Sequence, residues 1–150
     1  MRQAFSIRSK RVLLPEGEVA ATVRVVDGVI AAIDPYDTPD AEEEGVGDAV
    51  LMPGLVDTHV HLNEPGRADW EGFATGTAAA RAGGFTTLID MPLNSSPVTT
   101  DADALAQKRQ ASDGQLSVDV GFYGGLVPGN ADRMPELLDA GVRGITSPAR

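Results

Sequence analysis

The chain has 150 residues, of which 42% are hydrophobic, so it is long and apolar enough to bury a core and too apolar to be a disordered segment. Its formal net charge of −10 argues against a nucleic-acid partner, because no basic stripe is present to neutralise phosphates. It contains no cysteine, which excludes disulfides and any zinc site built from cysteine.

The amino terminus gives no sign of export or of membrane insertion. Residues 1–11 carry positive charges, but no apolar segment of signal-peptide length follows them. No stretch of the sequence approaches the ~20 consecutive apolar residues that span a bilayer. We therefore expect a cytoplasmic protein that has no membrane partner.

The first 50 residues have the pattern of a small antiparallel sheet. Residues 5–14 include two short strand-like runs, and β-branched residues dominate 18–26. Asp27-Gly28 separates this run from another at 29–33, which is the strongest short-range signal for a hairpin. The prolines, glycines and acids of residues 35–47 indicate a loop or linker.

From residue 51 onward, strand-like and helix-like segments alternate. The predicted strands cover 55–59, 85–90, 116–122 and 142–145, and the predicted helices cover 70–82, 101–111 and 132–140. Asp69 is the expected N-cap of the first helix, and Thr100 or Asp101 that of the second. This alternation specifies a parallel sheet with right-handed crossovers. Both an open doubly wound sheet and a (β/α)₈ barrel fit it, although a barrel typically needs ~250 residues.

The most informative feature is the pair His59 and His61, the only two histidines of the chain. Residues i and i+2 of a strand point to the same face, so both imidazoles would converge just beyond the end of the predicted strand. Two neutral nitrogens presented in this way suit a divalent metal. Histidines also occur at this spacing by chance, but a polar loop follows at 63–67, which is typical of the place where α/β folds put their chemistry.

Three blocks of sequence resemble the cyclic amidohydrolases, the family that contains dihydroorotases, hydantoinases and allantoinases. The segment Pro53-Gly-Leu-Val-Asp-Thr-His-Val-His61 resembles the metal-binding signature of this family. Residues 63–73 and 83–95 are most similar to blocks of the allantoinases, and the resemblance covers nearly the whole chain. It implies a hydrolase that opens the hydantoin ring of allantoin to give allantoate, with a hydantoinase/dihydropyrimidinase or a dihydroorotase as the alternative.

Two asparagines carry the implied substrate preference. Dihydroorotases have an arginine directly after His-x-His-Leu, where it grips a substrate carboxylate with two hydrogen bonds, and this chain has Asn63 there. They have Met-Pro-Asn-Thr after the second strand, whereas this chain has Met91-Pro-Leu-Asn94. The resemblance therefore implies Asn63 and Asn94 as substrate-binding residues for a neutral ring such as that of allantoin.

The resemblance also implies a fold and a metal centre. The fold is α/β, the amino-terminal part of a (β/α)₈ barrel at 51–150 preceded by the amino-terminal strands of a small β-sandwich at 1–50. The metal centre of the family holds two zinc ions, and His59 and His61 would bind one of them. A carbamylated lysine would bridge the two ions. The full-length proteins of the family are implied to be homo-oligomers that act on a small molecule.

The chain departs from the family near its carboxyl end. Thr146 stands where the family has the lysine that becomes carbamylated, and a hydroxyl cannot form a carbamate. The further histidines and the aspartate that complete the family's site are missing, so no catalytic residue is assigned. We expect a truncated chain without hydrolase activity of its own. The alternative from another class is a noncatalytic product or an interaction module.

Overall fold

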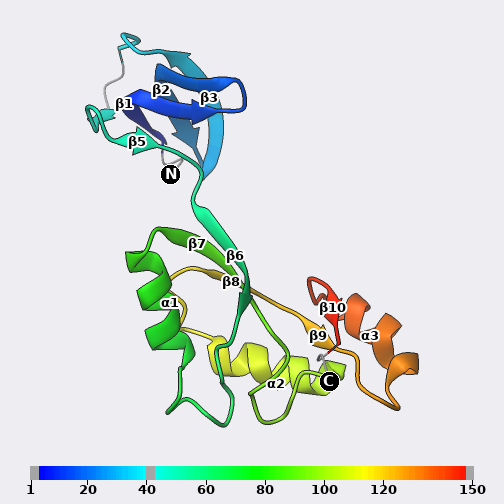
Figure 1. The fold of residues 1–150 in the computed structure, drawn as a ribbon. Coiled ribbons are helices and arrows are strands. Elements are labelled where there is room, and N and C mark those ends of the chain that lie inside the picture. The colour runs from blue at the N-terminus through cyan, green and yellow to red at the C-terminus, as the bar shows by residue number, and fades with distance from the viewer. Residues whose placement is uncertain (1–3, 40–42, 148–150) are drawn as a thin grey trace. The chain divides into compact units, whose positions relative to one another are not determined.

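Two compact units make up the chain, Met1–Pro53 and Gly54–Arg150. The structure is a computed structural model that describes residues 4–39 and 43–147, and its elements are labelled in Figure 1. Among the described residues, the first unit holds strands, and the second alternates strands with helices.

The first unit is a five-stranded sheet built on a hairpin. Its strands are β1 (Ala4–Leu14), β2 (Gly17–Val26), β3 (Val29–Pro35), β4 (Glu43–Gly45) and β5 (Val50–Leu51). The first three are antiparallel, in the order β3-β2-β1. Asp27 and Gly28 form the turn between β2 and β3 with φ angles of 53° and 78°, the left-handed conformation that such a two-residue turn requires. The predicted hairpin is therefore confirmed.

Strand β4 lies in a segment that the sequence predicts as a loop, and that prediction is wrong there. β4 pairs in parallel with residues 6–8 of β1, and Arg8 forms an ion pair with Glu43. A three-residue strand without a large apolar side chain has no hydrophobic alternation that would reveal it. Strand β5 also pairs in parallel with β1, so the sheet is mixed and only its hairpin part is antiparallel.

The second unit has a parallel arrangement of strands that follows the order of the chain. Its elements are β6 (Leu55–Val60), α1 (Phe73–Ala82), β7 (Phe85–Asp90), α2 (Ala102–Ser112), β8 (Asp119–Phe122), β9 (Gly124–Gly125), a 3₁₀ turn (Ala131–Arg133), α3 (Met134–Asp139) and β10 (Ile145–Thr146). β6, β7 and β8 form one sheet, and β10 pairs with β9, which follows β8 after one residue. A doubly wound sheet would reverse its strand order at a switch point. The order found among the described strands is that of a (β/α)₈ barrel.

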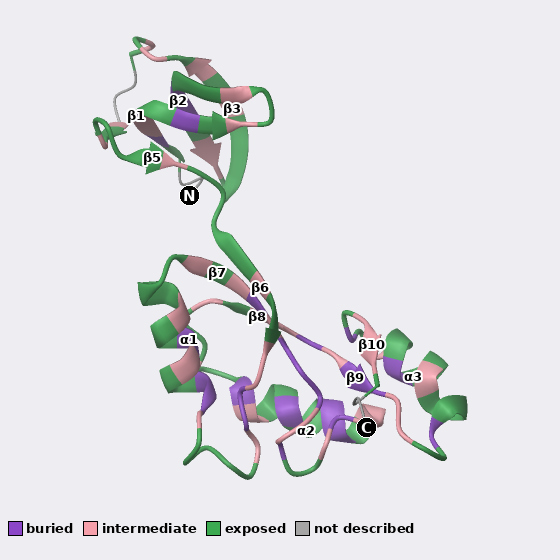
Figure 2. Ribbon diagram, viewed as in Figure 1, coloured by how far each residue is buried: buried purple, intermediate pink, exposed green. Residues whose placement is uncertain are grey.

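The three helices pack against one face of these strands. The core cluster joins strand and loop residues with residues of every helix: Leu62, Phe73, Leu88, Leu105, Phe122, Leu137 and Val142. Along β7, Leu88 and Asp90 are buried while Thr87 and Ile89 are half-buried, as the alternation of side chains in a strand requires. Figure 2 marks the buried positions along α2, which are Ala104, Leu105, Lys108 and Ser112.

Helix α1 begins three residues later than the sequence predicts, and Asp69 is not its cap. Residues 68–70 form a turn, and Gly72 is the N-cap. The carboxylate of Glu64 accepts a hydrogen bond from the N–H of Phe73 at 2.6 Å and so satisfies the first turn from nine residues away. Capping motifs are recognised from adjacent residues, so a cap supplied by the preceding loop gave no local signal.

Three further elements differ from the prediction in the last third of the chain. The third strand begins at Asp119 and not at Leu116, and the fourth is Ile145–Thr146 and not 142–145. The predicted helix 132–140 is split into the 3₁₀ turn and α3, and Gly141, with a φ of 92°, follows its end. The type of each element is predicted correctly. The bounds of the short strands β8 and β10 depend on their pairing with β7 and β9.

Replacing Asp101 by alanine is expected to lower the free energy of unfolding by about 1 kcal/mol. Asp101 is confirmed as the N-cap of α2, where its carboxylate accepts a hydrogen bond from the N–H of Ala104 at 2.8 Å. Asp101→Ser is the control, because a serine hydroxyl can accept the same bond and should keep most of the stability. Urea denaturation measures both variants, and equal losses would contradict the capping role.

Candidate functional site

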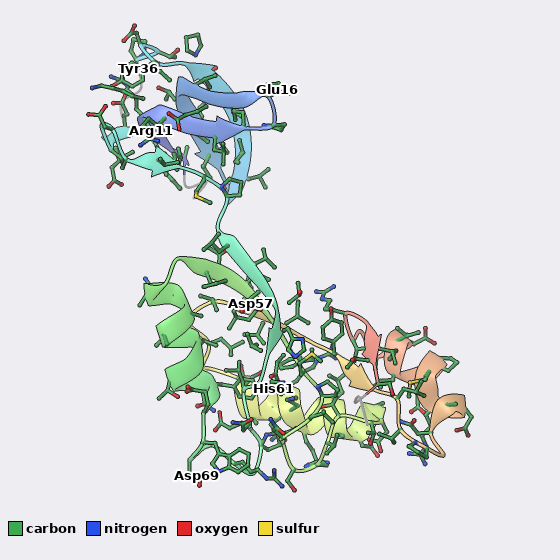
Figure 3. All side chains as sticks on the ribbon, viewed as in Figure 1. Arg11, Glu16, Tyr36, Asp57, His61 and Asp69 are labelled. Atoms are coloured by element: carbon green, nitrogen blue, oxygen red, sulfur yellow. The ribbon has the colours of Figure 1, made fainter. Side chains whose placement is uncertain are left out.

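The two histidines lie at the carboxyl end of β6. His59 is exposed near the end of the strand and His61 is half-buried just beyond it, and Figure 3 labels His61 there, with Asp57 within β6. Their ring centroids are 5.5 Å apart and the ring planes make an angle of 62°. Two imidazoles bound to one zinc ion at about 2.0–2.1 Å and a near-tetrahedral angle would have centroids about 5 Å apart. The spacing of the rings therefore fits a shared metal ion.

Asn94, in the loop after β7, is brought against His61. Its Nδ2 is 3.3 Å from Nδ1 of His61, and in this arrangement Nδ1 accepts the hydrogen bond and the ring proton sits on Nε2. A half-turn of the amide would put Oδ1 in the same place, make Nδ1–H the donor and free Nε2 for a metal ion. Metal-bound histidines commonly donate their second ring N–H in this way. Asn94 is thus placed to orient His61.

Asn63 follows β6 and is nearly buried, with 6% of its surface exposed. Its backbone N–H donates to the carbonyl of Glu71 at 2.9 Å, and its carbonyl accepts from the N–H of Arg67 at 3.1 Å. The side-chain Oδ1 is buried and has no hydrogen-bond partner among the residues that the structure describes. A buried amide oxygen without a donor is costly, so a ligand N–H would be accepted favourably here.

Asp57 contacts the backbone rather than an imidazole. Its carboxylate accepts a hydrogen bond from the N–H of His59 at 2.9 Å. This bond supports the strand end on which the histidines lie.

The loops after β6 and β7 are joined to each other. The N–H of Ser96 donates to the carbonyl of Pro65 at 2.7 Å. Gly66 has a φ of 94°, and a Cβ on it would lie 2.9 Å from Cβ of Ser96 and 3.0 Å from its carbonyl oxygen. A side chain at Gly66 would therefore be strained and would separate the loops.

A buried ion pair beneath the two strand ends was missed by the sequence reasoning. Lys108 and Asp90 have side chains that are 1% and 0% exposed, and Nζ lies 2.5 Å from Oδ2. Nζ also donates to the carbonyl of Met91 at 3.0 Å, and Oδ1 of Asp90 accepts from the N–H of Leu62 at 2.7 Å. The signal was available, because Lys108 lies four residues after Ala104 and three after Leu105 on the buried stripe of α2.

Burial raises the pKa of Asp90 to about 6, although the Lys108 ammonium and the N–H of Leu62 act against this shift. Burial also lowers the pKa of His61 from its ordinary 6.5, and the positive charges of His59 and Lys108 add to the effect. A histidine that stays neutral near neutral pH keeps a lone pair for a metal ion.

A titration of the folded chain is expected to give His61 a lower pKa than it has in the urea-denatured chain. The chain has only two histidines, so ring ¹⁵N NMR resolves each of them. Between the two pKa values the unfolded chain binds more protons at His61, so this residue makes the free energy of unfolding rise with pH, and the contribution is lost on acidification. Equal midpoints in the two states would contradict the expected desolvation.

The site-specific measurement is needed because Asp90 acts in the opposite sense. Its pKa is raised from 3.8 to about 6, so between these values the folded chain binds more protons at Asp90. Its contribution therefore makes the free energy of unfolding fall as pH rises through that window. The pH dependence of the total free energy of unfolding is the sum of the contributions of His61 and Asp90, so it cannot be assigned to either residue.

Thr146 lies on β10, where it pairs with Gly125 of β9 and is half-buried. The chain's two lysines are occupied elsewhere: Lys10 lies 3.2 Å from Asp48, and Lys108 is paired with Asp90. Over residues 4–39 and 43–147, no three histidine, aspartate or glutamate side chains come together as a ready ligand set. The described part of the chain thus offers a metal ion two imidazoles.

No helix in the described ranges is both long and apolar enough to cross a membrane.

Comparison with known proteins identifies amidohydrolases as relatives of the chain. Residues 50–146 match the model of the amidohydrolase family. The chain is 52% identical over 142 residues to an allantoinase of Streptomyces avermitilis. The aligned region covers 93% of this chain and 32% of that protein. It is 49% identical over 152 residues to an allantoinase of Arabidopsis thaliana, covering 95% of the chain and 30% of that protein. The chain spans about a third of the length of these relatives.

Solved structures agree with the strand order described above. The L-hydantoinase (dihydropyrimidinase) of Arthrobacter aurescens superposes with a TM-score of 0.80 and 33% identity, covering 97% of this chain and 32% of that one. A dihydropyrimidinase of Brevibacillus agri gives 0.75 and 26%, covering 95% and 32%. The predicted fold class is confirmed: the amino-terminal part of a (β/α)₈ barrel, preceded by the amino-terminal strands of a small β-sandwich.

Proposed function

Since the chain belongs to the amidohydrolase family, we propose that it serves the metal-dependent opening of the hydantoin ring of allantoin to allantoate. The observation that carries the proposal is the arrangement at the carboxyl ends of β6 and β7, where His59 and His61 lie 5.5 Å apart and Asn94 contacts His61. The allantoinases among the relatives support the choice of substrate.

His59 and His61 would hold a divalent ion, and zinc suits two neutral imidazoles. A bound zinc ion supplies hydroxide near neutral pH and polarises a carbonyl oxygen. The chain's own residues do the positioning: Asn94 orients the ring of His61, and the hydrogen bond from the His59 N–H to Asp57 steadies the strand end. Two ions, as the resemblance implies, would need a bridging ligand that Thr146 cannot form as a carbamate.

Asn63 and Asn94 would bind the substrate through neutral amides. The unpartnered Oδ1 of Asn63 is suited to accept an N–H of a ring or ureido group, and a carboxylamide carries no charge that would select a carboxylate. Allantoin is a neutral ring with several N–H donors and carbonyl acceptors. The binding of a small molecule of this class is therefore favoured over that of a dihydropyrimidine carboxylate.

We propose residues 1–50 as the sandwich portion and 51–150 as the barrel portion of the protein, a cytoplasmic location, and a homo-oligomer without nucleic-acid or membrane partners. Because Thr146 stands in place of the bridging lysine and the family's later histidines and aspartate are missing from these 150 residues, we also propose that they bind metal without turning over substrate by themselves, and that ring opening in the organism requires the remainder of a longer protein.

Growth on allantoin tests the proposal with the protein in its own organism. A His61→Gln allele is expected to abolish growth when allantoin is the only nitrogen source and to leave growth on ammonium unchanged. A Gln107→Ala allele is the matched control, because Gln107 is exposed on α2. Undiminished growth of the His61→Gln strain on allantoin would sink the proposal.

A hydantoinase is the second candidate, and the likeness to the Arthrobacter aurescens L-hydantoinase favours it. The same strains discriminate the two. Loss of growth on a 5-substituted hydantoin, with growth on allantoin retained, would move the assignment to that substrate class.

A further inference from the structure

The buried pair of Lys108 and Asp90 is not explained by stability alone. Both side chains are almost completely removed from water, and the desolvation of two charges offsets much of their attraction. Apolar side chains of similar volume in such a place are often neutral or more stable. The pair is also outside the set of residues that would touch metal or substrate.

One arm of the pair reaches the strand that carries the histidines. Oδ1 of Asp90 accepts a hydrogen bond from the N–H of Leu62 at 2.7 Å, and Leu62 lies between His61 and Asn63. The N–H of Met91 donates to the carbonyl of Val60 at 2.8 Å on the other side of His61. The backbone of His61 is thus held on both sides by residues at the end of β7.

The other arm reaches the loop that carries Asn94. Nζ of Lys108 donates to the carbonyl of Met91 at 3.0 Å, three residues before Asn94. The same ammonium lies 2.5 Å from Oδ2 of Asp90. One ion pair therefore connects the two segments whose side chains meet as His61 and Asn94.

We propose that Asp90 and Lys108 are positioning residues, which set the backbone of Leu62 and of Met91 so that His61 and Asn94 stay in contact. That this contact serves a metal centre rests on the proposed function, but the positioning itself does not. Neither residue touches metal or substrate in this role, and each acts through the backbone of a neighbour.

Two double variants separate the arms without leaving a single buried charge. In Asp90→Asn/Lys108→Met, the asparagine keeps an oxygen for the Leu62 N–H, and the donor to Met91 is lost. In Asp90→Leu/Lys108→Met, both hydrogen-bonding connections are lost and both positions become apolar. Arg109→Met is the matched control, because Arg109 is the next cation on α2 and donates to the carbonyls of Ala140 and Gly141 at 2.8 and 3.2 Å, away from the site.

NMR of the 150-residue chain without metal reports on both connections, the hydrogen bond from the Leu62 N–H to Asp90 and the one from Lys108 to the carbonyl of Met91. In the leucine variant we expect the Leu62 amide to exchange about tenfold faster relative to the Leu105 amide, with loss of the nuclear Overhauser effect between the His61 ring and the Asn94 amide. In the asparagine variant, Leu62 should stay protected while the His61 to Asn94 effect weakens, which is a rescue of one arm only.

If the leucine variant does not fold, the asparagine variant still decides, because a weakened His61 to Asn94 contact with Leu62 protected supports the proposal. Unchanged spectra in the asparagine variant, or an equal disturbance of the His61 ring by Arg109→Met, would overturn it. Since neither metal nor substrate is present, failure of allantoin hydrolysis leaves this result standing on its own.

Discussion

Replacing Lys108 alone by methionine is expected to lower the free energy of unfolding by about 3–5 kcal/mol, because an unpaired carboxylate is then left in the core. Asp90 is 0% exposed, and its Oδ2 has the Lys108 ammonium at 2.5 Å as its counter-charge. The loss should become smaller as the pH falls, because removal of the Lys108 ammonium raises the pKa of Asp90 further and the protonated carboxyl needs no counter-charge. Urea denaturation of the chain at neutral and at mildly acidic pH measures both effects.

The matched comparison is the double variant Asp90→Asn/Lys108→Met. It removes both charges, so most of the lost stability should return although two residues have been changed. A double variant as unstable as Lys108→Met would show that the cost comes from packing of the lysine stem, and it would contradict the electrostatic explanation. Arg109→Met gives the background cost of losing a cation from the exposed side of the same helix.

Replacing His61 by glutamine is expected to weaken zinc binding by more than about 100-fold, because changes to residues that merely orient a ligand already cost 10–100-fold. His59→Gln should have an effect of the same order, since each residue supplies one of two imidazoles. Asn94→Leu should cost only about tenfold, because it removes the partner that orients His61 and leaves both ligands in place. Isothermal titration with zinc near neutral pH gives the three affinities.

Asp57→Asn is the control for these measurements. Its amide oxygen can still accept the N–H of His59, so zinc binding should change little. A His61→Gln chain that binds zinc as tightly as the unchanged chain would place the metal away from β6. An Asn94→Leu effect as large as that of His61→Gln would instead make Asn94 a ligand.

Most of the elements could be predicted from the sequence because they have local signals. The Asp27-Gly28 turn, the strand at residues 85–90 and the Asp101 cap each depend on neighbouring residues, and each is found where expected. β4 and the start of α1 depend on partners far along the chain: β4 pairs with residues 6–8 of β1, and the cap of α1 comes from Glu64. Local patterns cannot reveal a partner at that distance.

The residues of the candidate site could be predicted from the sequence, but the contacts that hold them in place could not. The spacing of His59 and His61 follows from the strand period, and the structure places the rings within reach of one ion. The contact between His61 and Asn94 joins two loops, so only the parallel pairing of β6 and β7 brings it about. The buried Lys108 has helical spacing from Leu105, yet nothing in the sequence states that its partner is Asp90.

The bond between Ser96 and Pro65 has a consequence for loop exchange between relatives. A protein engineer could replace the loop after β6 or the loop after β7 by the corresponding loop of a relative. Because Gly66 leaves room for the backbone of Ser96, a grafted loop with a larger residue there would displace its neighbour. The two loops are therefore one transferable cassette, and chimaeras that take them together should keep the geometry that single grafts lose.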